Sequence, residues 1–184
     1  YKKLYKRHPK ETIKPGDMFI GNDPYNGGGN HLPDIVVAAP AFEGETMIGW
    51  VVNMAHHSDI GGKVPGSTSG DATSIYQEGL KLPIIRICEN DKVLDNVMDL
   101  ILANTRVPRE RYGDLIAQIS ANRVGVRRLK EAYARYNMIL LDCMEELQNY
   151  AERRLRTVIS DLKEGVYKFT DYMDNGGERY PNPL

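Results

Sequence analysis

The sequence predicts an α+β fold, in which a small mixed or antiparallel sheet with Gly-rich loops is followed by a long helical segment. The first half of the 184-residue chain alternates short apolar stretches with loops rich in glycine, proline and asparagine. From about Arg109, apolar residues recur at steps of three and four, which is the period of an amphipathic helix. We therefore expect one unit over residues 1–184, with the sheet in 1–90, helices in 91–164 and the start of a further strand region in 165–184.

Four apolar stretches in the first half have the composition and length of short strands. The second and third are joined by a turn at residues 43–45, so we predict that they pair as an antiparallel hairpin. Both are apolar on their two faces, which predicts that they are buried. The four predicted strands are Met18–Ile20, Ile35–Ala39, Met47–Met54 and Leu82–Ile87.

Two short helices are predicted before the long apolar repeat. One occupies the first residues and ends before Pro9, because proline cannot continue a helix. The other spans Val93–Ala103, where apolar residues fall on one side. Pro108 then suits the first turn of the next helix.

The apolar repeat over residues 115–162 predicts one long amphipathic helix or two, with a break near residues 136–137. Such a stripe usually belongs to a core; the alternative, in a fragment, is that part of it lies exposed and favours self-association. Asn122 is its one polar member. Gly165 is expected to be the C-cap of the helix. Residues 166–170 then alternate in the manner of an edge strand.

The composition is that of a globular protein without a strong charge bias. The formal net charge is -1, which argues against a nucleic-acid partner. No apolar run is long enough to cross a bilayer, and the first residues lack the apolar region of a signal peptide, so we expect a cytoplasmic protein without a membrane partner. Cys88 and Cys143 form no metal or disulfide motif and are expected to be two buried thiols in a reducing compartment. Both ends of the sequence suggest a fragment of a longer chain.

Three of the four histidines, together with two aspartates, flank the predicted hairpin. His31 and Asp34 stand at the start of its first strand, and His56, His57 and Asp59 follow its second strand. The start of one antiparallel strand lies beside the end of its partner, so His31, Asp34 and His56 are expected at one end of the sheet. Two imidazoles and a carboxylate suit Zn, Mn or Fe(II) and leave open positions for water or substrate. The alternative is that these histidines only stabilise tight turns.

The other loops carry weaker signals. Glu78 lies in a predicted loop and is a candidate general base or a group that orients a metal ligand; the alternative is an exposed turn. The glycines at 27–29 do not form a phosphate loop, because no Lys-Ser/Thr pair follows them. The hydroxyls at 67–69 have no base beside them and are poor candidates for a nucleophile.

At these same residues the sequence resembles the hydantoinase B/oxoprolinase family, over nearly its whole length. The segments that carry the resemblance are Pro15-Gly16-Asp17, Asn22-Asp23-Pro24-Tyr25, residues 28–34, residues 56–62, Pro65-Gly66-Ser67, Gln77-Glu78-Gly79, Asn104-Thr105-Arg106, Gly113-Asp114-Leu115 and Ala117-Gln118.

The resemblance implies a B-type subunit that works in a hetero-oligomer with an A-type, actin-like ATPase partner. The partner phosphorylates the oxygen of a small-molecule substrate with ATP, and the B-type subunit completes the reaction at a divalent metal. The family's ligand positions correspond to His31, Asp34 and His56, while a further acidic ligand comes from upstream of this segment. His57 and Asp59 would orient ligands or move protons.

Three functions remain open at this stage. The first is the metal-binding component of an ATP-dependent amidohydrolase that acts on a hydantoin, 5-oxoproline or a lactam. The second is the corresponding subunit of an ATP-dependent ketone carboxylase acting on acetone or acetophenone. The third is a non-catalytic helical interaction module in which the His and Asp loops are only structural.

Overall fold

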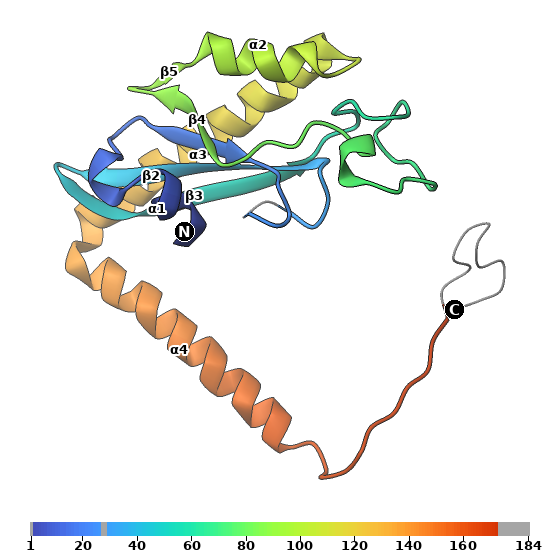
Figure 1. The fold of residues 1–184 in the computed structure, drawn as a ribbon. Helices are drawn as coiled ribbons and strands as arrows, with labels where there is room; N and C mark the ends of the chain where they lie inside the picture. The colour runs from blue at the N-terminus through green and yellow to red at the C-terminus, as the bar shows by residue number, and fades with distance from the viewer. Residues whose placement is uncertain (1, 27–28, 173–184) are drawn as a thin grey trace. The chain divides into compact units, whose positions relative to one another are not determined.

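The computed structural model describes residues 2–26 and 29–172 (Figure 1). Two compact units are present, one over residues 1–135 and one beginning at Tyr136. Most of the expected further strand region, residues 173–184, lies outside the described residues. Within the described part, no helix is both long and apolar enough to span a membrane.

A five-stranded antiparallel sheet forms the centre of the first unit, which confirms the predicted α+β class. Its spatial order is β3-β2-β1-β4-β5. The strands are β1 (Met18–Gly21), β2 (Asp34–Glu43), β3 (Thr46–His56), β4 (Ile85–Glu89) and β5 (Lys92–Val93). The predicted β2–β3 hairpin is present, and its paired residues run from Asp34 opposite His56 to Glu43 opposite Thr46.

The helices follow the sequence prediction closely. They are α1 (Lys2–Arg7), α2 (Asp95–Ala103), α3 (Pro108–Tyr136) and α4 (Met138–Ser160), with 3-10 turns η1 (Lys10–Thr12) and η2 (Ile75–Gln77). Pro108 is the first residue of α3, as expected. The predicted break lies at Asn137, whose φ of 51° is incompatible with a continuous helix.

The two faces of the sheet are covered differently (Figure 1). The main core packs α2 and the first half of α3 against one face, where Ile35, Val37, Leu115 and Ile119 are all buried. Gly125 permits this close packing, because a Cβ there would lie 2.5 Å from Val51 Cγ1. A smaller cluster lies on the other face, formed by Leu4, Ile13 and Phe19 with Tyr5, Phe42, Met47, Trp50 and Ile84.

The second face is only partly covered, and this corrects one prediction. β3 was expected to be buried on both faces, but Val52 and Met54 are 48% and 58% exposed. Side chains alternate between the faces of a strand, and the small α1 cluster does not extend over these two residues. The candidate site residues His56 and Asp34 lie at the open end of this face.

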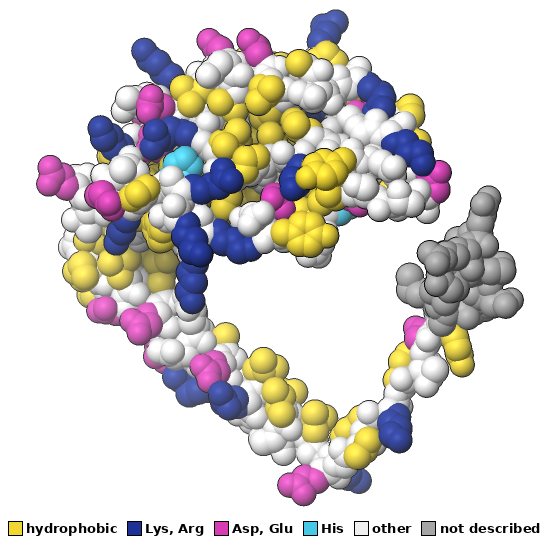
Figure 2. Space-filling view, viewed as in Figure 1, with side chains coloured by type: hydrophobic (Ala, Val, Ile, Leu, Met, Phe, Trp, Pro, Cys, Tyr) yellow, Lys and Arg dark blue, Asp and Glu magenta, His cyan; other side chains and the backbone are white. Residues whose placement is uncertain are grey.

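The second unit contains α4 and the residues that follow it. Every residue from 142 to 172 is exposed, so the apolar stripe is core at Leu115 and Ile119 but not beyond residue 141. Figure 2 shows hydrophobic side chains following one another along α4.

Two predictions near the end of the described chain are wrong. Residues 166–170 form no strand, because within the described residues no neighbouring strand pairs with their backbone. Gly165 is not the helix C-cap, because α4 ends at Ser160 and Asp161 caps it.

The two cysteines occupy different environments. Cys88 is buried, as predicted, and burial raises the pKa of its thiol to about 11. Cys143 was also expected to be buried, but it lies exposed on α4. The sequence places it within an apolar stripe, and that stripe is uncovered here.

We therefore expect one of the two thiols to react rapidly with Ellman's reagent in the native protein. The fast thiol is Cys143, while Cys88 reacts only after unfolding because it is buried and its thiolate is disfavoured. The matched control is Cys143→Ser, which should remove the fast phase. Fast reaction of both thiols would contradict the burial of Cys88.

Candidate metal centre

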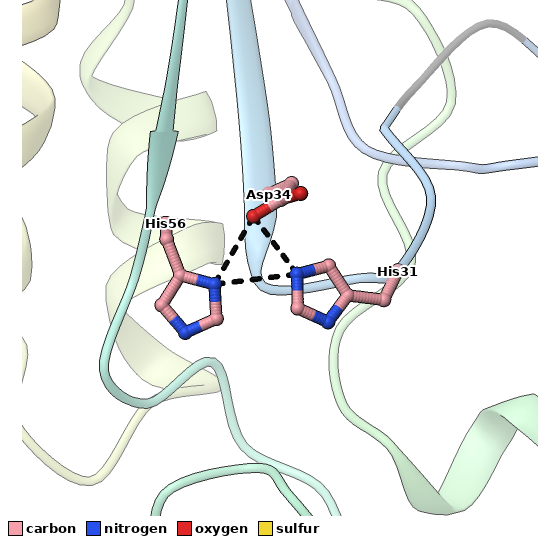
Figure 3. A group of neighbouring side chains, drawn as sticks. All are labelled: His31, Asp34 and His56. Atoms are coloured by element: carbon pink, nitrogen blue, oxygen red, sulfur yellow. Dashed lines mark hydrogen bonds and ion pairs between the residues drawn. The ribbon is translucent and has the colours of Figure 1, made fainter. Parts of the chain in front are cut away.

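Three side chains converge at the end of the β2–β3 hairpin (Figure 3). Asp34 is the first residue of β2, His56 is the last residue of β3, and the two are directly paired in the ladder. Paired residues of an antiparallel ladder project from the same face, so both point to the open face of the sheet. His31 comes from the turn before β2, which is closed by a hydrogen bond from the Asp34 N–H to the His31 carbonyl oxygen.

The donor atoms of these side chains form a compact triangle. Asp34 Oδ1 lies 2.9 Å from His31 Nε2 and 3.1 Å from His56 Nδ1, and the two nitrogens are 3.2 Å apart. Donor atoms about 2.1 Å from a shared metal ion, at angles of about 90–100°, are roughly 3.0–3.2 Å apart. The triangle therefore fits a divalent metal ion, and these are the three residues that the hairpin geometry predicted.

The site is open on one side. The side chains of His31 and His56 are 47% and 58% exposed, whereas that of Asp34 is only 17% exposed. Gly29 lets the preceding loop pass directly against the site, because a Cβ there would lie 2.6 Å from the Asp34 Cβ. The exposed rings leave room for a further ligand or a substrate to approach.

His31 and His56 stabilise the ionised form of Asp34. Burial alone would raise the pKa of this carboxyl group, but hydrogen bonds with His31 and His56 outweigh burial, so its pKa lies below the ordinary value. The carboxylate is thus ionised near neutral pH. An ionised carboxylate is the form that binds a metal ion.

His57 lies on the opposite side of the sheet from His56. Its ring is 1% exposed and is hydrogen bonded to Gln118 and Arg111 of α3. Burial lowers the pKa of His57 below its ordinary value; the nearby Arg111 guanidinium lowers it further, and the bond to Gln118 opposes this. Among the described residues, the group that could hold a metal ion does not include His57.

Asp59 organises the loop that follows β3. Its carboxylate accepts hydrogen bonds from the backbone N–H groups of Gly61, Gly66 and Arg106 and from the Arg106 guanidinium. Burial would raise the pKa of Asp59, but these four donors lower it to about 2. Gly61 has a φ of 90° and lies against the Asn104 carbonyl oxygen, so this loop tolerates no side chain there.

We expect Asp59 to make the stability of the protein depend on acid pH. Its folded pKa of about 2 is below the value of about 3.9 for an unfolded chain, so its contribution is complete above the unfolded pKa and is lost as the pH falls towards 2. The contribution is roughly 2 kcal/mol. Urea unfolding measures the free energy of unfolding at about pH 6 and about pH 3. The difference between these two values should be smaller for Asp59→Asn than for the wild type. An unchanged dependence would contradict this assignment.

The remaining candidates are not part of the triangle formed by His31, Asp34 and His56. Glu78 follows η2, where its N–H donates to the Ile75 carbonyl oxygen, and it is not part of the metal-binding group formed by the described residues. The Ser67 hydroxyl accepts from the Ile60 N–H and donates to the Gly61 carbonyl oxygen, which gives it a structural role. Of the glycines at 27–29, only Gly29 lies within the described residues.

Sequence reasoning assigned no structural role to the polar residues behind the site, although Asn122 was noted in the apolar stripe and Gln118 in the family resemblance. Arg111, Gln118 and Asn122 are buried on the face of α3 that packs against the sheet. Gln118 Nε2 donates to the Ile35 carbonyl oxygen, and Asn122 Nδ2 donates to that of Val37. The available signal was their spacing of seven and four residues, which places them on one helix face with the apolar stripe.

Comparison with known proteins agrees with this arrangement. The family model described as Hydantoinase B/oxoprolinase matches residues 1–182. Caprolactamase subunit beta of Pseudomonas jessenii is 34% identical over 91% of this chain and 29% of its own length. The 5-oxoprolinase of Dictyostelium discoideum is 29% identical over 90% of this chain and 14% of its own length.

A solved structure places the same fold in a larger protein. The crystal structure of the ATP-dependent caprolactamase from Pseudomonas jessenii superimposes with a TM-score of 0.82 at 34% identity, over 89% of this chain and 28% of that chain. This chain thus spans less than a third of the length of each of these relatives. The sequence and the structure together show that the chain belongs to the hydantoinase B/oxoprolinase family.

Proposed function

We propose that this chain is the metal-binding part of an ATP-dependent hydrolase of cyclic amides. The observation that supports this most strongly is the triangle of His31, Asp34 and His56, whose donor atoms lie 2.9–3.2 Å apart on the open end of the sheet. The substrate class comes from the names of the relatives, a caprolactamase and a 5-oxoprolinase. Each of those names refers to a cyclic amide.

A divalent ion, Zn, Mn or Fe(II), would be held by His31 Nε2, Asp34 Oδ1 and His56 Nδ1, and would supply Lewis acidity towards a carbonyl oxygen and a nucleophile at neutral pH. The side chains themselves do the positioning. The ionised Asp34 offsets positive charge at the site, and the two half-exposed rings leave one side open to a small substrate. In the metal-free protein the same nitrogens of His31 and His56 are hydrogen bonded to Asp34 Oδ1, and their bridging protons would be released on metal binding.

In this proposal, a partner subunit and not this chain uses the ATP. One relative is named as a subunit beta, and its structure is described as ATP-dependent, which supports a second subunit. We propose that this second subunit is an A-type ATPase, that it activates the amide by phosphorylation, and that the two work as a cytoplasmic hetero-oligomer.

The test is an assay of the full-length subunit that contains this chain, together with its ATPase partner and ATP. Hydantoins, 5-oxoproline and caprolactam are compared with acetone and acetophenone plus bicarbonate, and both ring opening and phosphate release are measured. Ring opening of an amide that stops on chelation and returns with metal supports the proposal. Carboxylation of a ketone without ring opening would overturn it in favour of a carboxylase. A metal content below about 0.2 equivalents would overturn the metal site and leave a non-catalytic interaction module.

A further inference from the structure

His57 is placed where it can control the geometry of the ligand next to it. The sequence puts two histidines side by side at the end of β3, yet the two rings lie on opposite sides of the sheet. His56 is on the open face with Asp34, whereas His57 is buried against α3. Anchoring of the His57 ring therefore restrains the backbone next to a proposed metal ligand.

The hydrogen bonds of the His57 ring define its protonation state. Arg111 Nη1 lies 2.5 Å from Nδ1, and because a guanidinium only donates, Nδ1 must accept. Nε2 therefore carries the ring proton and donates it to Gln118 Oε1 at 2.9 Å. Gln118 Nε2 donates to the Ile35 carbonyl oxygen and to Asn53 Oδ1, which makes Oε1 the acceptor in this network. Both ring nitrogens of His57 are thus hydrogen bonded to side chains of α3.

The backbone of His57 reaches the other half of the site. Its N–H donates to the Pro33 carbonyl oxygen at 2.9 Å, in the turn between His31 and Asp34. One residue thus ties the end of β3 to the turn that carries the other two proposed ligands, while its ring is anchored to α3. Arg111 supports the same link, because its Nη2 donates to the Ser58 hydroxyl at 2.9 Å.

We propose that His57 is a positioning residue that holds His56 and Asp34 at the separation a metal ion requires, with Arg111 and Gln118 of α3 as its anchors. This inference rests on the proposed metal site. It gives the two adjacent histidines different roles, one as a ligand and one as an internal brace that neither binds the metal nor carries protons. Outer residues that orient metal ligands commonly change metal affinity by about 10–100-fold when they are replaced.

The test compares two variants that each remove two buried hydrogen bonds, one variant at His57 and one away from its network. His57→Phe keeps a ring of similar size but loses the bonds to Arg111 and Gln118. Ser67→Ala loses the bonds to the Ile60 N–H and the Gly61 carbonyl oxygen, in the loop after β3 and outside the His57 network. Co²⁺ is titrated into the purified full-length subunit that carries each change. Its visible absorption spectrum and its affinity are measured alongside the free energy of unfolding.

We expect both variants to be destabilised but only His57→Phe to lose about 10–100-fold in Co²⁺ affinity and to change the Co²⁺ spectrum. Equal affinity in both variants and the wild type would overturn the positioning role and leave the metal site intact. A wild type that binds no Co²⁺ would instead overturn the metal site on which the role depends.

A measurement on the metal-free wild type covers the case in which His57→Phe does not fold. Two-bond ¹H–¹⁵N correlation spectra distinguish the two neutral tautomers of histidine. We expect His57 to carry its proton on Nε2, as its partners require. A proton on Nδ1, or on both nitrogens, would overturn the proposal, because Arg111 could not then donate to the ring.

Discussion

Replacing His56 by alanine is expected to abolish turnover and to lower the affinity for Zn²⁺ by more than about 100-fold, since a lost ligand should cost more than a lost supporting residue. The imidazole supplies one corner of the donor triangle, 3.1 Å from Asp34 Oδ1 and 3.2 Å from His31 Nε2. Of the three donors in this chain, His31 and Asp34 would then remain, and neither could replace the third. Isothermal titration with Zn²⁺ measures the binding, and the assay with the ATPase partner measures the turnover.

The His56→Ala variant should fold normally, which separates its effect from a general loss of structure. The side chain is 58% exposed, so we expect the free energy of unfolding to change by no more than about 0.5 kcal/mol. The matched control is His8→Ala, which removes a histidine that contacts Ile84 and Phe19 instead. It should keep the Zn²⁺ affinity of the wild type. Wild-type affinity and turnover in His56→Ala would show that His56 is not a ligand.

Replacing Asn22 by leucine is expected to produce the largest loss of stability, about 3–5 kcal/mol. Asn22 is fully buried directly after β1, and its side chain makes three hydrogen bonds to backbone groups. Its Nδ2 donates to the carbonyl oxygens of Leu32 and Leu80, and its Oδ1 accepts from the Leu82 N–H. Leucine has a similar volume but would leave these three groups buried without partners.

Urea unfolding followed by circular dichroism measures the effect of Asn22→Leu. Asn96→Leu is the matched control, because Asn96 is exposed on α2 and bonds only to the neighbouring Val97 N–H, so we expect a change within about 0.5 kcal/mol. A similarly small change for Asn22→Leu would show that the Leu32 turn and the Leu80–Leu82 segment do not depend on this side chain. Because Leu32 follows His31, we also expect weaker Zn²⁺ binding in Asn22→Leu.

A buried hydrogen-bond network holds the strands behind the candidate site in place, although His31 and His56 themselves are exposed. Gln118 and Asn122 donate to carbonyl oxygens of β2, and Asn53 of β3 bonds to both residues. Each of these groups is paired, which avoids the cost of burying an unsatisfied polar atom. The network links α3 to the two strands that end at Asp34 and His56.

Much of the site could be predicted because its determinants are local. The apolar stretches around a short turn predict the β2–β3 hairpin, and an antiparallel hairpin necessarily brings the start of one strand beside the end of the other. Asp34 and His56 are therefore neighbours for a reason that is visible in sequence spacing. The start of α3 at Pro108 was predictable in the same way, from a single residue with a restricted backbone conformation. The break was predicted near residues 136–137, and the structure adds its cause, the positive φ of Asn137.

Other features depended on contacts between distant segments. The insertion of β1 between β2 and β4 follows no local pattern, and residues 166–170 alternate like a strand but pair with none of the described strands. Cys143 shows the same limit, because an apolar stripe predicts a buried face only where another element covers it.

The sequence by itself determined the α+β class, the hairpin and the identity of the candidate ligands His31, Asp34 and His56. Only the tertiary structure decided the different environments of the two adjacent histidines. Successive side chains at the end of a strand point to opposite faces, but which face is open and which is covered by α3 is set by packing about 60 residues away in the chain. That packing leaves His56 exposed to a ligand and encloses His57 between Arg111 and Gln118.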